Sequence, residues 1–468
     1  METGMKNQNV RIEFDSLGSV KVPKDALYGA QTVRALQNFQ ITGRRVNDMM
    51  YLALAQVKKA CALANKSVGE LDGPRCDAIV FACDEIISGK YKEAFITDAI
   101  QGGAGTSMNM NVNEIIANRA AQILNKPIGV YDYIHPNDHV NRAQSTNDII
   151  PTAGKLTVLN LGMLLVEEMT FLADTFHAKA LEFSSIIKVG RTHLQDAVLI
   201  SMGQVFHSYE SVVRRDIQRL KLSLSEMQVI NLGATAVGTG INSVEGYREH
   251  AVTHLSRITG KSFVSAEDLV DATKHVDGFA NVHGSLKTFA VGLSRICNDI
   301  RMMASGPKVG FNEIFLPEKQ PGSSIMPGKV NPVIPEVVNQ VCFQVIGNDT
   351  TVTLAAEAGQ MELNVFEPVL FDNLFESLEI LRHACATLRI HAIQDIKVNE
   401  HRIQDYVEHS LAMATALVKY LGYEKVSEIT KQALKENKSL KTLVLEQGLM
   451  SEAEVDEALK PESMIHPR

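Results

Sequence analysis

The stretch FANVHGSLKTFAVGLSRICNDIRMM, residues 279–303, decides the fold class of this 468-residue chain. Its apolar positions are spaced alternately by three and four residues: Phe279, Val282, Leu286, Phe289, Leu293, Ile296, Ile300 and Met303. This spacing places one apolar stripe along a helix and predicts partner helices packed nearly parallel to it. We therefore expect a mainly α-helical protein built around a bundle of long helices.

Two other stretches carry the same kind of stripe. One runs from Val158 to Phe176, and the other from Leu374 to Leu388. If residues 151–188 form one helix, it is roughly 55 Å long, longer than a small domain is wide. Such a rod needs neighbours along its whole length, and a homo-oligomeric bundle would supply them. We assign these stripes to the protein core and not to a ligand site.

The composition restricts the classes of function. The net charge is −8 and the pI is about 6.0, which argues against nucleic acid as a main partner. Residues 1–9 are polar and lack the apolar region of a secretory signal, and no apolar run reaches the roughly 18 residues of a membrane span. The six cysteines are scattered and form no Cys-x-x-Cys pair, as is typical of reduced thiols. We expect a cytoplasmic protein without membrane or nucleic-acid partners.

A loop, QPGSSIMPGKVNP at 320–332, interrupts the helical patterns. Gly322 and Gly328 provide backbone freedom at its two ends, so the loop has the hinges that closure over a ligand requires. It offers two hydroxyls, one lysine and one asparagine, and no carboxylate before Glu336, which suits a small anion. A phosphate-binding P-loop is excluded, because five residues separate the two glycines and a valine follows the lysine. Taken alone, the loop also fits an ordinary connector.

Three more polar loops stand apart in the chain: QGGAGTSMN at 101–109, QSTNDIIP at 144–151 and GRTHLQD at 190–196. The first is not a dinucleotide fingerprint, because Met108 occupies the third glycine position and no strand precedes it. Helix capping is the simplest interpretation of the first two loops, and a helix N-terminus also attracts anions. The third contains a lone histidine, a residue that is more often structural than catalytic. We find no metal-ligand or cofactor motif, and we expect neither a metal nor a cofactor.

The loop at 320–332 resembles the signature loop of the aspartase/fumarase superfamily, whose members eliminate fumarate from succinyl-type substrates. The resemblance extends over nearly the whole chain, through blocks at 11–18, 102–107, 145–148, 190–196 and 238–242. It implies three mostly helical domains, which we place at 1–144, 145–398 and 399–468. It also implies a central long-helix bundle that assembles a homotetramer, with each active site built from loops of three subunits.

Carried over residue by residue, the resemblance implies a substrate pocket and a base. The α-carboxylate of the substrate would be held by Thr192, Lys329 and Asn331. The β-carboxylate would be held by Thr106, Ser145, Thr146 and Ser324. Asn147 and His193 would face the leaving group, and Ser323 would be the general base. On chemistry alone His193 is the competing base, because the unperturbed pKa of histidine is near about 6.5.

The pocket residues do not separate the aspartase branch from the class II fumarase branch. The flanking segments NPVIPEVVNQV at 331–341 and GQMELNVFEP at 359–368 resemble aspartases. This implies reversible elimination of ammonia from L-aspartate to fumarate through an aci-carboxylate, with no metal or cofactor. Fumarate hydration is the alternative reaction, and a catalytically silent helical scaffold is the alternative from another class. Three positions depart from the usual pattern without belonging to the implied pocket: Ile150, Leu199 and Val205.

Overall fold

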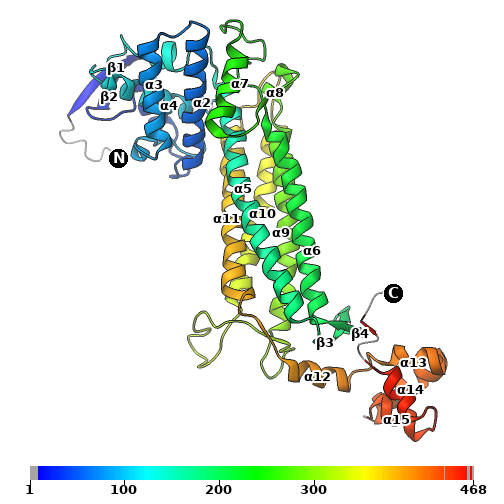
Figure 1. Cartoon of the computed structure of the whole chain (residues 1–468). Coiled ribbons are helices and arrows are strands. Elements are labelled where there is room, and N and C mark those ends of the chain that lie inside the picture. The colour runs from blue at the N-terminus through cyan, green and yellow to red at the C-terminus, as the bar shows by residue number, and fades with distance from the viewer. Residues whose placement is uncertain (1–8, 437, 461–463, 466–468) are drawn as a thin grey trace. The chain divides into compact units, whose positions relative to one another are not determined.

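The computed structural model describes residues 9–436, 438–460 and 464–465. Its internal contacts divide the chain into two units, each described here by itself. The first unit comprises Met1–Val166, Gln218–Thr288 and Gln344–Leu381, and the second comprises Glu167–Ile217, Phe289–Phe343 and Arg382–Arg468. The expected mainly α-helical class is confirmed (Figure 1). The division into three domains is a different partition of the chain and stays a prediction.

Long helices contribute residues to both units: α5 (Thr146–Glu182), α6 (Met202–Ser225), α9 (Asp277–Met303), α10 (Val333–Glu357) and α11 (Glu367–Leu388). Every residue of the stripe in α9 is buried, as the spacing predicted. In the first unit, the ring of Phe279 in α9 meets the ring of Phe371 in α11 edge-on, with centroids 5.0 Å apart. In the second unit, Phe176 of α5 packs against Tyr209 of α6, with centroids 5.7 Å apart. Aromatic and aliphatic side chains therefore hold the bundle helices together within each unit.

Helix α5 begins five residues before the expected start at 151 and ends at Glu182, six residues before the expected end. It begins earlier because Ser145 caps it, so Pro151 falls inside the second turn and not at the first position. It ends earlier because a strand, β3 (Ile187–Thr192), follows after a short turn. By length and composition α5 could cross a membrane, but 78 % of its most apolar window is buried inside the protein, as in the core helix of a soluble protein.

The N-terminal part of the first unit packs a two-stranded hairpin, β1 (Val10–Asp15) and β2 (Gly18–Pro23), beside a group of helices. These helices are α1 (Ala30–Asn38), α2 (Asp48–Ser67), α3 (Gly73–Ile87) and α4 (Thr106–Ile123). A later segment of the same unit adds α7 (Tyr247–Thr259), which packs against α2, and the short helix α8 (Leu269–Lys274). Helix α2 contacts α3, α4 and α7 and is buried along most of its length. Two short strands, β5 (Val229–Ile230) and β6 (Val264–Ser265), pair in parallel nearby.

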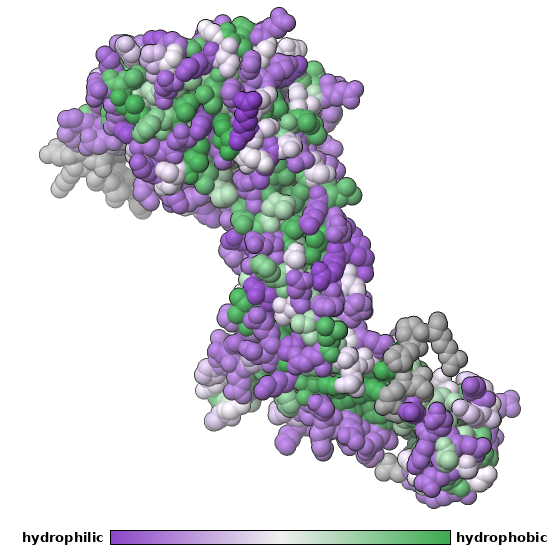
Figure 2. All heavy atoms as spheres, in the orientation of Figure 1, coloured by the Kyte–Doolittle hydropathy of each residue, from purple (hydrophilic) through white to green (hydrophobic). Residues whose placement is uncertain are grey.

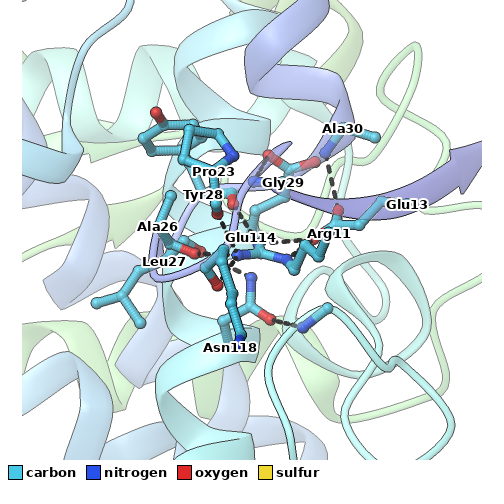
Figure 3. A network of polar contacts seen from close by, with 12 residues as sticks. Arg11, Glu13, Pro23, Ala26, Leu27, Tyr28, Gly29, Ala30, Glu114 and Asn118 are labelled. Carbon is cyan, nitrogen blue, oxygen red and sulfur yellow. Dashed lines mark hydrogen bonds and ion pairs between the residues drawn. The ribbon is translucent and has the colours of Figure 1, made fainter. Parts of the chain in front are cut away.

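A buried network of polar side chains attaches the hairpin and α1 to α4 (Figure 3). Glu114 of α4 accepts the backbone N–H groups of Gly29 and Gln31, at 2.7 and 2.9 Å. Glu13 of β1 accepts the N–H of Ala30 at 2.9 Å, so two carboxylates cap the start of α1. Burial raises the pKa of Glu114, although these N–H groups and the Thr32 hydroxyl oppose the shift. The network fixes α4, and Thr106 is the first residue of that helix.

The second unit contains the hairpin β3–β4, in which β4 spans Gln195–Ser201, and the short antiparallel pair β7 (Ile314–Phe315) and β8 (Lys397–Val398). Helix α12 (Glu400–His409) lies against β3. Four short helices follow: α13 (Ala414–Leu421), α14 (Tyr423–Glu436), α15 (Leu440–Glu446) and α16 (Glu452–Ala458). They enclose an apolar core of their own around Leu417, Leu443 and Val455.

Candidate active site

In the first unit, the beginnings of α4 and α5 meet. Thr106 is the first residue of α4 and Thr146 the first of α5, and their hydroxyl oxygens lie 3.4 Å apart. The residue before Thr106, Gly105, has φ +84°, a left-handed conformation that favours glycine. The first turns of both helices carry backbone N–H groups without intrahelical acceptors. Their positive ends therefore converge at a place suited to a carboxylate.

The segment Ser145–Asn147 combines helix capping with the display of polar groups. The Ser145 hydroxyl accepts the N–H of Asn147 at 3.2 Å, and the Ser145 N–H donates to the carboxylate of Asp148 at 2.9 Å. The Ser145 side chain therefore caps α5 while Asp148 binds the Ser145 N–H in return, so the capping interpretation of this loop is confirmed. The side-chain amide of Asn147 donates to the carbonyl of Ala236 at 2.7 Å, which ties it to a second loop of the same unit.

In the second unit, Thr192 and His193 lie at the turn of the β3–β4 hairpin. Thr192 pairs with Gln195, and the two residues between them, His193 and Leu194, have φ +54° and +61°. Two left-handed residues match the twist of a two-residue hairpin, but both carry a Cβ, so this turn is strained. Thr192 and His193 are exposed. Both side chains thus lie at the surface of the second unit and take no part in its core.

The base of this hairpin is held by a buried carboxylate. Glu313 is 1 % exposed and lies 2.5 Å from the guanidinium of Arg191 and 3.0 Å from the ammonium of Lys188. The Arg191 guanidinium also lies over the ring of Phe311, 4.5 Å from its centroid. Because Arg191 directly precedes Thr192, this cluster fixes the strand that carries the predicted carboxylate ligand.

In the second unit, hydrogen bonds hold the two ends of the loop 320–332 together. The N–H of Gly322 donates to the Lys329 carbonyl at 2.8 Å, and the Asn331 amide donates to the Gly322 carbonyl at 2.6 Å. A Cβ at position 322 would lie 2.8 Å from the backbone nitrogen of Asn331, so only glycine fits. At the other expected hinge, Gly328 has φ +77°. Close packing of the backbone therefore requires glycine at position 322, and the left-handed conformation favours glycine at position 328.

Within this loop, the hydroxyl oxygen of Ser323 accepts two backbone N–H groups. Those of Ile325 and Met326 lie at 3.2 and 3.0 Å. Hydrogen bonds of this kind favour an ionised hydroxyl over a neutral one. Ser323 is half-buried, whereas Ser324 and Lys329 are exposed. The loop thus supplies one half-buried hydroxyl with two donors and, at Lys329, one exposed positive charge.

The structure therefore collects the implied pocket residues into three groups. Thr106, Ser145, Thr146 and Asn147 form one group in the first unit. In the second unit, Thr192 and His193 share the hairpin turn, while Ser323, Ser324, Lys329 and Asn331 share one loop. Among the described residues, no three His, Cys, Asp or Glu side chains are grouped so as to hold a metal ion.

Sequence reasoning missed the buried charges that support these groups: Lys58, Asp148 and Glu313. Lys58 stands among the apolar positions of α2, and this placement in the sequence could have indicated a buried charge. The three departures from the family pattern have packing roles. Ile150 fills the space beside Gly105, and Leu199 and Val205 line a cavity of about 690 Å³ in the second unit.

The comparisons with known proteins cover almost the whole chain. The Lyase family profile matches residues 18–347, and that of the fumarase C C-terminus matches 413–466. An aspartate ammonia-lyase from a Bacillus species is 49 % identical over 98 % of both chains. One from Escherichia coli K12 is 45 % identical over 98 % of this chain and 97 % of the other.

Two solved structures superpose closely. A cobalt-bound Brucella melitensis protein titled fumarate lyase:delta crystallin has a TM-score of 0.95 and 46 % identity, covering 98 % of this chain and all of the other. A class II fumarase from Schistosoma mansoni has a TM-score of 0.94 and 35 % identity, with the same coverage. The family profiles and the full-length relatives agree, and the chain belongs to the Lyase family within the aspartase/fumarase superfamily.

Proposed function

We propose that this chain is an aspartate ammonia-lyase, which reversibly eliminates ammonia from L-aspartate to give fumarate. The observation that carries this proposal is the 45–49 % identity to aspartate ammonia-lyases along nearly the full chain. The fumarase with a solved structure is 35 % identical, which favours the carbon–nitrogen lyase over the hydratase.

The reaction begins with removal of a proton from Cβ, a carbon that is made acidic only by its neighbouring carboxylate. The electron pair moves into that carboxylate and produces an aci-carboxylate with added negative charge. Donors that bind this charge more strongly than the ground state lower the barrier. The converging starts of α4 and α5, with the hydroxyls of Thr106, Ser145 and Thr146, have the chemistry to do so. Ser324 would add a further hydroxyl to this set.

Ser323 is the proposed general base. A serine hydroxyl is a weak base unless its ionised form is stabilised, and the N–H groups of Ile325 and Met326 already point at its oxygen. Thr192, Lys329 and Asn331 are proposed to bind the α-carboxylate, and Asn147 and His193 to face the amino group. The amide of Asn331 would exchange its bond to the Gly322 carbonyl for one to the substrate when the loop closes.

We propose that the enzyme is a homotetramer whose active sites combine loops of different subunits. This would bring together residue groups that belong to separate units of one chain. Apolar side chains left exposed on the long helices support such assembly, including Leu222 and Leu354 in the first unit and Val291 and Phe343 in the second. Figure 2 shows such hydrophobic residues at the surface. Buried free cysteines agree with the proposed cytoplasmic location.

The decisive experiment supplies L-aspartate and L-malate in separate assays and follows the absorbance of fumarate. We expect turnover of L-aspartate and little or none of L-malate. Faster turnover of L-malate would replace the ammonia-lyase with a fumarate hydratase. Silence with both substrates, from protein that is folded and assembled, would favour a scaffold that retains the fold without the reaction.

A further inference from the structure

Asp148 is a fully buried carboxylate directly behind the proposed substrate residues. One of its oxygens accepts the N–H of Ser145 at 2.9 Å. The other accepts the N–H groups of Gly233 and Thr235, at 2.9 and 3.2 Å. These donors come from two segments more than eighty residues apart. The carboxylate therefore joins the start of α5 to the 231–236 turn.

Asn147 strengthens the same junction. Its side-chain amide donates to the carbonyl of Ala236 at 2.7 Å, and its own carbonyl accepts the amide of Asn231 at 3.0 Å. That carbonyl is free because its ordinary helical donor would be the N–H of residue 151, and Pro151 has none. A proline inside α5 therefore creates the acceptor that the turn uses.

Lys58 of α2 holds the other end of the same segment. Its side chain is fully buried, and its ammonium donates to Asn141 Oδ1 and Gln144 Oε1, both at 2.8 Å. Asn113 of α4 shares the Asn141 oxygen at 3.1 Å. Residues 141–148 are thus fixed at one end by a buried cation and at the other by a buried anion.

The two buried charges also influence each other electrostatically. Burial raises the pKa of Asp148 to about 6, partly offset by its backbone donors, and lowers the pKa of Lys58 to about 7. The other titratable groups that face Asp148 are Cys61 of α2 and Tyr247 of α7. Burial raises the pKa of both, so they are neutral near pH 7 and leave Lys58 as the compensating charge.

We propose that Asp148 is a positioning residue for the elimination: its carboxylate holds Ser145–Asn147 against the 231–236 turn, with Lys58 fixing the opposite end of the segment. This inference rests on the proposed function. An asparagine cannot replace the carboxylate, because its amide has one acceptor oxygen and would turn an NH₂ group toward at least one backbone N–H. Asp148 touches no reacting atom and acts through the hydroxyls and N–H groups at the start of α5.

The test compares Asp148→Asn with Asp77→Asn, a control carboxylate that is 71 % exposed in a surface ion pair with Lys66. We expect Asp148→Asn to lower kcat/KM for L-aspartate by about tenfold or more, through kcat as well as KM. Amide hydrogen exchange should accelerate in peptides 141–150 and 231–240 and stay unchanged in the other bundle peptides. Asp77→Asn should match the wild type in both measurements. Wild-type kcat/KM in folded Asp148→Asn would overturn the proposal.

A measurement on the unaltered enzyme covers the case in which Asp148→Asn fails to fold. Between pH 7.5 and 5 both Lys58, with a pKa of about 7, and Asp148, with a pKa of about 6, gain protons. Protonation of Lys58 should strengthen its hydrogen bonds to Asn141 and Gln144, whereas protonation of Asp148 should lower kcat/KM and the protection of the Ser145, Gly233 and Thr235 amides together, after correction for intrinsic exchange. Unchanged protection and activity over this range would overturn the proposal. If the wild type uses L-malate and not L-aspartate, the proposed function fails, and the same comparison run with L-malate still tests Asp148.

Discussion

The hydroxyl of Thr106 lies 3.4 Å from that of Thr146, although forty residues separate them in the chain. Each hydroxyl belongs to the first residue of a helix, so the contact brings two positive helix ends together. This arrangement concentrates stabilisation where the proposed aci-carboxylate gains charge, and it predicts how the enzyme responds to loss of one donor.

Thr146→Val keeps the shape of the side chain and removes the hydroxyl. Because the lost donor serves a charge that grows in the transition state, kcat should fall by about 10²–10³ while KM changes less. Steady-state kinetics with L-aspartate measure this. Thr175→Val in the same helix is the control, since its hydroxyl bonds the Phe171 carbonyl away from the site. A rise in KM with an unchanged kcat would mean that the Thr146 hydroxyl binds the substrate and the transition state equally strongly.

Ser323→Ala should reduce kcat by about three orders of magnitude or more, because the base is lost, while the protein still assembles and binds substrate. His193→Ala should have a milder effect that acts partly through KM, since this side chain lies at an exposed hairpin turn. The comparison needs kcat and KM for both variants and a sizing measurement. High kcat in Ser323→Ala beside an inactive His193→Ala would transfer the base role to the histidine.

Lys329→Ala should raise KM strongly, because an ion pair desolvated by the closed loop contributes roughly 2–5 kcal/mol to binding. The substitution leaves the hydrogen bond between the two ends of the loop intact, because the N–H of Gly322 donates to the main-chain carbonyl of residue 329 and not to its side chain. KM for L-aspartate and the inhibition constant of fumarate measure the effect. An unchanged KM would make Lys329 a solvated surface charge.

Lys58→Met should alter how stability depends on pH. Burial lowers the pKa of Lys58 from 10.5 to about 7, so between these values the unfolded chain binds more protons than the folded one. Stability contributed by this group therefore rises with pH across that window, by at most about 4–5 kcal/mol. Urea unfolding at pH 8, 9 and 10, at one protein concentration, should give a smaller rise, or a steeper fall, in the variant. Parallel pH dependences would mean that the pKa of Lys58 is not lowered in the folded protein.

Glu313→Gln should destabilise the β3–β4 hairpin, because it leaves the buried cation of Lys188 and the partly buried cation of Arg191 beside a neutral amide. Breaking a buried ion pair from one side typically costs about 3–5 kcal/mol. The free energy of unfolding measures this, with Glu318→Gln as the control at an exposed carboxylate of the same segment. Equal stability of the two variants would contradict a structural role for the cluster.

The sequence by itself determined the helical class and the chemistry of the candidate site. The spacing from Phe279 to Met303 can bury its apolar residues only with parallel neighbours, and all of them are buried. Gly322 stands where the backbone leaves no room for a side chain, and Gly328 has a left-handed φ, so the residue types alone predicted the loop. Both signals are local, because they depend on repeat spacing and backbone freedom.

Only the tertiary structure decided which polar groups meet. Sequence spacing does not show that Thr106 contacts Thr146, that Asp148 binds the N–H groups of Gly233 and Thr235, or that the ammonium of Lys58 is buried. The sequence predicted a start for this helix at residue 151, five residues after its actual start at Thr146. Pro151 leaves the Asn147 carbonyl without its helical donor, and the replacement donor, the side chain of Asn231, comes from a distant segment that no local pattern reveals. Burial of a charge is set by the packing of distant segments around it, and that packing determines both its pKa and its role.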